Sequence, residues 1–164
     1  MRRMLLLILM VVATNFSYAQ WVEHQALLST PKYLPIGEQV NAVVEMNALI
    51  NSFVPDYEQT RMDTNNRERI YVYTNPAGHK LYILYTYGVN SRAKMVNRIS
   101  INGDQNDVLK IYNGYFNTDR TINPKKHTYQ LDFFEYNGMK YHARMDPEIE
   151  DSKVVSWSIY IGKY

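Results

Sequence analysis

The stretch Tyr136-Asn137-Gly138-Met139 predicts a tight turn at the centre of a β-hairpin. Asn-Gly is a favoured pair for the two central positions of a type I′ turn, where both residues have positive φ angles. Residues 127–136 and 139–145 flank the turn and are rich in residues that favour strands. A register centred on the turn places Phe133 opposite His142, so it also predicts which side chains meet across the two strands.

Further strands are predicted on both sides of this hairpin. Short segments rich in Tyr, Val, Ile and Phe alternate with turn residues from position 69 onward. The predicted strands are 69–74, 80–87, 94–102, 107–116, 127–136, 139–145 and 153–162. Most of the connections are too short for a crossover helix, so we expect an antiparallel meander.

One amphipathic helix is predicted over residues 38–54, before the strands. Val43, Met46, Ile50 and Phe53 follow one another at spacings of three, four and three residues, which places them on one helical face. Pro55 ends the segment. Ile50 and Phe53 are expected to point into the core against the sheet. The predicted fold class is therefore α+β, with one N-terminal amphipathic helix packed on a twisted antiparallel β-meander of about seven strands.

The first 19 residues have the pattern of a cleavable secretory signal. Two arginines precede an apolar run over residues 4–13, and Ser17-Tyr18-Ala19 places small residues at the −3 and −1 positions of a cleavage site before Gln20. A membrane-spanning helix needs about 20 apolar residues, which is longer than this run. We therefore expect a periplasmic or extracellular protein in which residues 20–164 form a single globular domain, without stable membrane insertion after cleavage.

The composition excludes several classes of function. The chain has 18 Lys and Arg against 16 Asp and Glu, and Arg2 and Arg3 belong to the signal, so the mature chain is formally neutral. A neutral domain without a basic cluster lacks the electrostatic footprint of a nucleic-acid-binding protein. The chain has no cysteine, which excludes disulfides, thiol nucleophiles and cysteine-bound metals. No sequence motif indicates a cofactor.

Tyrosine is the unusual feature of the composition, with 15 residues in the chain. Aromatic side chains with a polar end suit the recognition of glycans and proteins. Packing between neighbouring strands is the alternative role for such residues. The tyrosines that we predict to contact a ligand lie in the strands of the expected sheet: Tyr71, Tyr73, Tyr82, Tyr85, Tyr87 and Tyr141.

No catalytic or metal-binding residue is assigned. His142 would need a carboxylate such as Asp132 or Glu135 to act as a general base, and the predicted register instead places Phe133 opposite it. Residues 102–107 carry oxygen ligands at alternate positions, but the loop lacks the glycine and the glutamate of a calcium-binding EF-hand. We expect residues 102–107 to form a polar loop between two strands.

Three functions are consistent with these observations. The first is a non-catalytic exported domain that recognises protein, peptide or glycan through an aromatic-rich sheet surface. The second is a carrier of a small apolar ligand, in which the sheet curls as in lipocalins. The third is a secreted hydrolase that uses His142. A large cavity would favour the carrier, and an exposed aromatic patch would favour the binding domain.

The predicted hairpin can be tested by two substitutions in its turn. Gly138→Val should lower the free energy of unfolding by about 1–2 kcal/mol, because a Cβ is penalised at positive φ. Asn137→Gly should have a much smaller effect, because glycine adopts the same φ angles. Equilibrium denaturation of both variants makes the comparison. Equal effects of the two substitutions would place the turn elsewhere and shift the register of His142.

Overall fold

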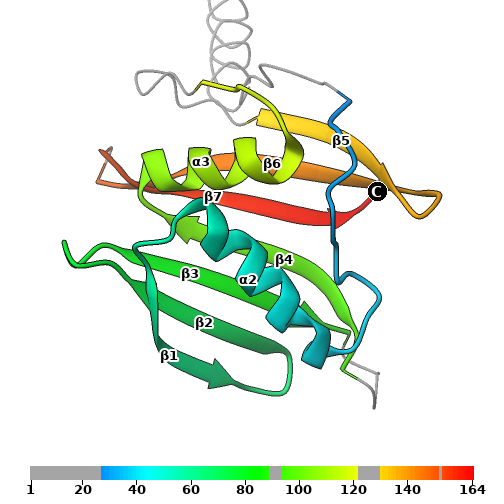
Figure 1. The fold of residues 1–164 in the computed structure, drawn as a ribbon, viewed down its shortest axis with the longest axis horizontal. Coiled ribbons are helices and arrows are strands. Elements are labelled where there is room, and N and C mark those ends of the chain that lie inside the picture. The colour runs from blue at the N-terminus through cyan, green and yellow to red at the C-terminus, as the bar shows by residue number, and fades with distance from the viewer. Residues whose placement is uncertain (1–26, 89–93, 122–129, 152) are drawn as a thin grey trace, which may run out of the picture.

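The computed structural model describes residues 27–88, 94–121, 130–151 and 153–164. The predicted signal, the segment 20–26 and the start of the strand expected over 127–136 lie outside the described residues. Within the described parts, no helix has the length and apolar character needed to cross a membrane. These parts form one antiparallel β-sheet with two α-helices, which is an α+β fold (Figure 1).

The sheet has seven strands in the spatial order β1-β2-β3-β4-β7-β6-β5. All neighbouring strands are antiparallel. The strands are β1 (Glu58–Thr64), β2 (Glu68–Thr74), β3 (Lys80–Tyr87), β4 (Val96–Gly103), β5 (Gln130–Tyr136), β6 (Met139–Glu150) and β7 (Lys153–Lys163). The predicted simple meander is wrong, because β4 pairs with β7. The last three strands therefore join the sheet in reverse order.

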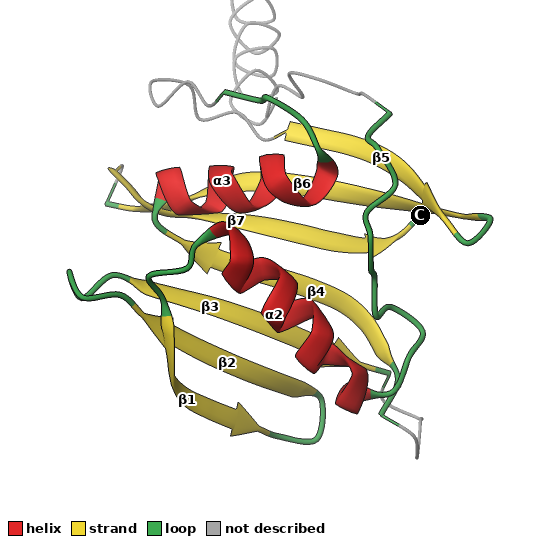
Figure 2. Ribbon diagram, viewed as in Figure 1, coloured by secondary structure: helices red, strands yellow, loops and turns green. Residues whose placement is uncertain are grey.

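Both helices lie on the same side of the sheet (Figure 2). A short 3₁₀ helix, η1 (Val40–Ala42), leads into α2 (Val43–Phe53), and α3 (Gln105–Phe116) connects β4 to β5. The prediction of a single N-terminal helix is not borne out, since the helices occupy 40–53 and 105–116. α3 also accounts for the reversed strand order, because it carries the chain from β4 past β7 and β6 to β5.

The strand predicted over 107–116 is the helix α3. Asp104 begins this helix, since its side chain accepts a hydrogen bond from the backbone N–H of Asn106 at 2.9 Å. The apolar residues also fit a helical period, and the buried ones are Val108, Ile111, Tyr112, Tyr115 and Phe116. The β-branched and aromatic residues of this segment resemble a strand in composition, whereas their spacing indicates a helix. The loop expected over 102–107 is thus the end of β4 and the start of α3.

Strand β1 was not predicted, because its sequence has no strand pattern. Glu58–Thr64 forms an edge of the sheet, and six of its seven residues are exposed. A strand with neither face buried has no need to alternate apolar and polar residues. Pairing with β2 holds it in the sheet instead. The expected number of about seven strands agrees with the structure because this strand replaces the one predicted over 107–116.

The predicted hairpin is confirmed in its turn and in its register. Asn137 and Gly138 have φ angles of 50° and 73°, as a type I′ turn requires. Tyr136 pairs with Met139, and Phe133 pairs with His142. The two tight-turn residues therefore determine the partners of every residue in β5.

The last residue of α2, Phe53, packs on α3. Ile50 is fully buried, as predicted, but Phe53 is only half-buried and its ring lies against Gly114. A Cβ at position 114 would lie 2.4 Å from the Cδ1 atom of Phe53. The absence of a side chain at Gly114 therefore lets the last residue of α2 approach the backbone of α3.

Gly114→Ala tests this contact. Alanine at an ordinary helical position stabilises by roughly 0.8–1 kcal/mol relative to glycine. Here the added methyl group would collide with Phe53, so we expect a loss of about 1–3 kcal/mol. In the Phe53→Ala background the same change should be neutral or stabilising. Urea denaturation of the four proteins gives the coupling energy, and its absence would show that the two helices do not meet at this point.

Candidate functional site

The six tyrosines predicted to contact a ligand do not form an exposed patch. Five of them are buried between the sheet and the helices: Tyr71, Tyr73, Tyr85, Tyr87 and Tyr141. Tyr82 points to the opposite side of the sheet and is 37% exposed. The five buried rings are part of the hydrophobic core, so Tyr82 is the one member of this set that a ligand could reach without a rearrangement of the core.

The hydroxyls of several tyrosines form hydrogen bonds that link different elements around this core. Tyr85 on β3 donates to the side chain of Asn47 on α2 at 2.6 Å. Tyr112 on α3 donates to Asp132 on β5 at 2.5 Å, and Tyr115 donates to the backbone oxygen of Tyr33 at 2.5 Å. Burial raises the pKa of Tyr85, Tyr112 and Tyr115 above the ordinary value, and Asp132 raises that of Tyr112 further. These hydroxyls stay protonated and satisfy buried acceptors.

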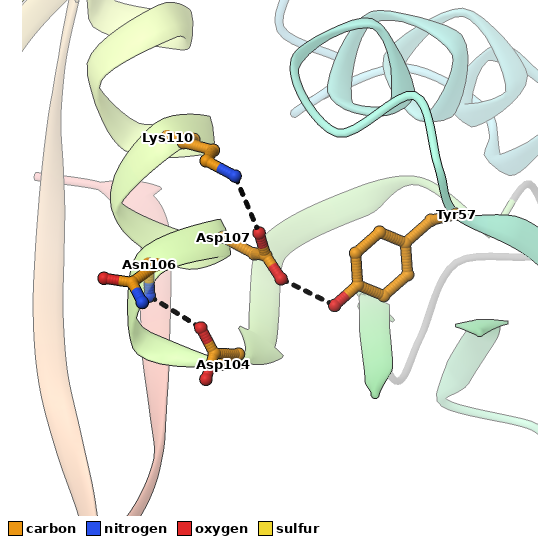
Figure 3. A network of polar contacts seen from close by, with 5 residues as sticks. All are labelled: Tyr57, Asp104, Asn106, Asp107 and Lys110. Atoms are coloured by element: carbon orange, nitrogen blue, oxygen red, sulfur yellow. Dashed lines mark hydrogen bonds and ion pairs between the residues drawn. The ribbon is translucent and has the colours of Figure 1, made fainter. Parts of the chain in front are cut away.

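A polar cleft of about 310 Å³ lies where α3 begins. Its walls come from the end of α2, the β2–β3 turn and the first turns of α3, and they include Asp104, Asp107 and His79. In Figure 3, Asp107 stands between Lys110 and Tyr57, and Asp104 faces Asn106.

Two of the three carboxylates that line this cleft, those of Asp104 and Asp107, have structural partners. Asp107 accepts a hydrogen bond from the hydroxyl of Tyr57 at 2.7 Å and forms an ion pair with Lys110 at 3.3 Å. Asp104 caps the N-terminus of α3. In the part of the chain that the structure describes, no group of three or more His, Cys, Asp or Glu side chains converges on a possible metal site. The described side chain of His79 makes no hydrogen bond or ion pair. The hydrogen bond between Tyr57 and Asp107 thus joins the chain after α2 to α3.

Neither of the two helices that the structure describes lies on the other face of the sheet (Figure 2). On β7 the buried Trp157, Ile159 and Ile161 point toward the helices, so the residues between them point the opposite way. We name this surface the open face. Its members on the three strands β4, β7 and β6 are Arg98, Ser100, Asn102, Ser156, Ser158, Tyr160, His142, Arg144, Asp146 and Glu148, and β3 adds Tyr82 and Leu84.

A hydrogen-bond network crosses three strands of the open face. The side-chain amide of Asn102 on β4 donates to the hydroxyls of Ser158 and Ser156 on β7, at 2.9 and 3.1 Å. Ser158 and Tyr160 both donate to Oε1 of Glu148 on β6, at 2.7 and 2.9 Å. Ser158 is only 2% exposed although neither helix covers it. The network therefore holds five polar side chains in fixed positions beside Tyr82.

An ion pair and a cation–π contact continue the network along β6. Arg144 pairs with Asp146 at 2.7 Å, and its guanidinium lies 5.0 Å from the centre of the Tyr160 ring. Burial raises the pKa of the Asp146 carboxyl, while the charge of Arg144 acts in the opposite direction. The hydroxyl of Tyr160 thus contacts the carboxylate of Glu148, and its ring contacts the guanidinium of Arg144.

His142 also lies on the open face but has no carboxylate partner among the described residues. Phe133 stands opposite it on β5, and Gly162 stands opposite it on β7, where a Cβ would lie 3.0 Å from the imidazole. Asp132 points to the helix side of the sheet and bonds to Tyr112. Burial and the charge of Arg144 lower the pKa of His142. The geometry of a His–carboxylate dyad is therefore absent from the described structure.

Sequence reasoning did not identify the network residues. Glu148 and Ser158 lie more than forty residues after Asn102, and the three residues share no motif. The one available signal was the alternation in 156–161, where polar residues or tyrosine separate Trp157, Ile159 and Ile161. This pattern predicts one polar face for β7, but the neighbours of that face depend on the pairing of β7 with β4.

Searches against protein-family models, curated proteins and solved structures found no match to this chain. The geometry of the site is therefore the basis for its interpretation.

The buried tyrosines predict a loss of stability at alkaline pH. Tyr57, Tyr112 and Tyr115 have folded-state pKa values raised above the ordinary 10.0 by burial and, for two of them, by a carboxylate partner. A raised pKa means that the folded chain holds its protons more tightly than the unfolded chain. The stability is then complete below pH 10 and falls as the pH rises above that value. Tyrosinate absorbance and circular dichroism, recorded together in one titration, should show the buried tyrosines ionising only as the protein unfolds. Ionisation of every tyrosine in a protein that stays folded would contradict this assignment.

Proposed function

We propose that this protein is an exported, non-catalytic binding domain that recognises a protein, peptide or glycan through the open face. Export rests on the charged, apolar and small-residue pattern of the first 19 residues. The binding role rests on one observation, which is the network from Asn102 through Ser158 to Glu148 and Tyr160.

The network supports binding because it fixes polar groups before a ligand arrives. A long polar side chain on a solvated surface usually loses conformational entropy when it contacts a ligand. Glu148 and Asn102 have already lost part of that freedom through their bonds to Ser158. Tyr82 lies directly opposite Asn102 on the neighbouring strand and adds a partly exposed aromatic ring. A fixed polar group beside an aromatic ring is suited to recognition.

The observations favour binding over the two alternatives. A lipocalin-like carrier needs a sheet that closes around a cavity, whereas this sheet is open, with β1 and β5 at its two ends. Its helix side is filled by buried residues, including Tyr85, Ile99 and Ile159. A hydrolase based on His142 needs a carboxylate within hydrogen-bond distance, and Phe133 occupies the opposing position.

Binding can be tested with arrays of saccharides and peptides probed with the purified protein. Tyr82→Ala should weaken any binding by roughly tenfold, because loss of a central aromatic contact costs upwards of about 1 kcal/mol. Val44→Ala is the matched control, because Val44 is also exposed but lies on α2, on the helix side of the sheet. Equal effects of the two changes, or no binding to either array, would contradict the proposed recognition surface.

A further inference from the structure

We propose that the ligand of the open face is a neutral saccharide chain. This inference rests on the proposed binding function and specifies its ligand. It follows from three properties of the patch formed by Tyr82, Asn102, Ser158, Tyr160 and Glu148: the arrangement of its aromatic rings, the hydrogen-bonding groups that it leaves available, and its charge.

The two tyrosines stand on either side of small side chains. Tyr82 on β3 is paired with Asn102 on β4, which is paired with Ser158 on β7. Tyr160 lies two residues further along β7, so its side chain points to the same face as Ser158. With strands about 4.8 Å apart and a rise of about 3.4 Å per residue, the two tyrosines are separated by roughly 12 Å along the surface. Two aromatic contacts at this separation suit an extended ligand.

The network leaves acceptors and a donor available to a ligand. Glu148 uses Oε1 for both of its hydrogen bonds, and Asn102 uses its side-chain nitrogen for both of its own. In the described structure, Oε2 of Glu148 and the side-chain oxygen of Asn102 therefore have no protein donor. The hydroxyl of Ser156 accepts from Asn102 and can still donate its own proton. A hydroxyl group donates and accepts, so a polyhydroxyl ligand matches this mixture.

The charge of the patch disfavours anionic ligands. Arg144 and Asp146 neutralise each other at 2.7 Å, which leaves the carboxylate of Glu148. Glu148 repels phosphate and carboxylate groups of a ligand. An uncharged ligand avoids this penalty, and its hydroxyls can form charge-assisted hydrogen bonds with Glu148.

The aromatic rings complete the match. The C–H groups of a pyranose ring form an apolar face, and Tyr82 offers a partly exposed aromatic ring that such a face can cover. The described structure pairs the hydroxyl of Tyr82 with no protein group, so its contribution to binding should come from the ring. This predicts that Tyr82→Phe keeps binding and that Tyr82→Ala loses it.

Affinity electrophoresis in native gels tests the inference with defined probes. The gels contain a soluble β-glucan, a xylan or a galactomannan as neutral polysaccharides, or polygalacturonate as an anionic one. We expect at least one neutral polysaccharide to retard the protein and polygalacturonate to have no effect. Tyr82→Ala should weaken the retardation by roughly tenfold. Glu148→Gln should weaken it by a smaller factor, because the amide keeps one acceptor oxygen but loses the charge. Tyr82→Phe and Val44→Ala should behave as the unchanged protein does, and thermal melting shows that each variant is folded.

The outcomes separate this inference from the proposed function. A protein that no neutral polysaccharide retards, or whose retardation is unchanged in folded Tyr82→Ala, overturns the saccharide ligand. If the same protein binds peptides on an array in a manner that depends on Tyr82, the binding function stands and its ligand is a peptide. If it binds neither polysaccharides nor peptides, both proposals fail. Retardation by polygalacturonate alone overturns the argument from charge.

Discussion

Burial of tyrosine between one face of the sheet and two helices is the interaction on which the structure depends. A buried tyrosine ring contributes apolar area, but a buried hydroxyl that has no hydrogen-bond partner costs about 1–3 kcal/mol. Tyr85 avoids this cost with Asn47, and Tyr112 avoids it with Asp132. Each bond links a strand to a helix, so the requirement for polar partners also sets the position of α2 and α3 on the sheet. In a chain without cysteine, these contacts take the place of covalent cross-links.

The contact between the two helices divides the surface above the sheet. Phe53 at the end of α2 lies on Gly114 of α3, and it lines two hollows, of about 490 and 310 Å³. The smaller hollow is the cleft at the start of α3, where Asp107 holds Tyr57 and Lys110. The bond from Tyr57 to Asp107 joins the chain after α2 to the start of α3. Asp107 therefore has a structural role in this cleft.

The polar side chains of the open face are held in fixed positions, although the packing of the hydrophobic core does not require this. A sheet face in contact with water needs only polar side chains, which can remain mobile. Here Ser158 is almost completely buried among its neighbours, and Glu148 is held by two hydroxyls. These hydrogen bonds limit the motion of the side chains without adding to the hydrophobic core. Such an arrangement is what a recognition surface requires, and it is the reason for placing the proposed function there.

The sequence by itself determined the elements whose signals are local. The Asn137-Gly138 turn specified its own φ angles and the pairing of Phe133 with His142, and the apolar spacing over 43–53 specified α2. The edge strand β1 and the helix α3 were not recovered: β1 has no buried face to pattern its sequence, and in α3 strand-forming residues carry a helical spacing. Only the tertiary structure decided which tyrosines are buried and which polar residues meet on the open face. The polar contacts on the open face depend on the pairing of β4 with β7, which joins segments more than fifty residues apart, and no local pattern in either strand specifies that partner.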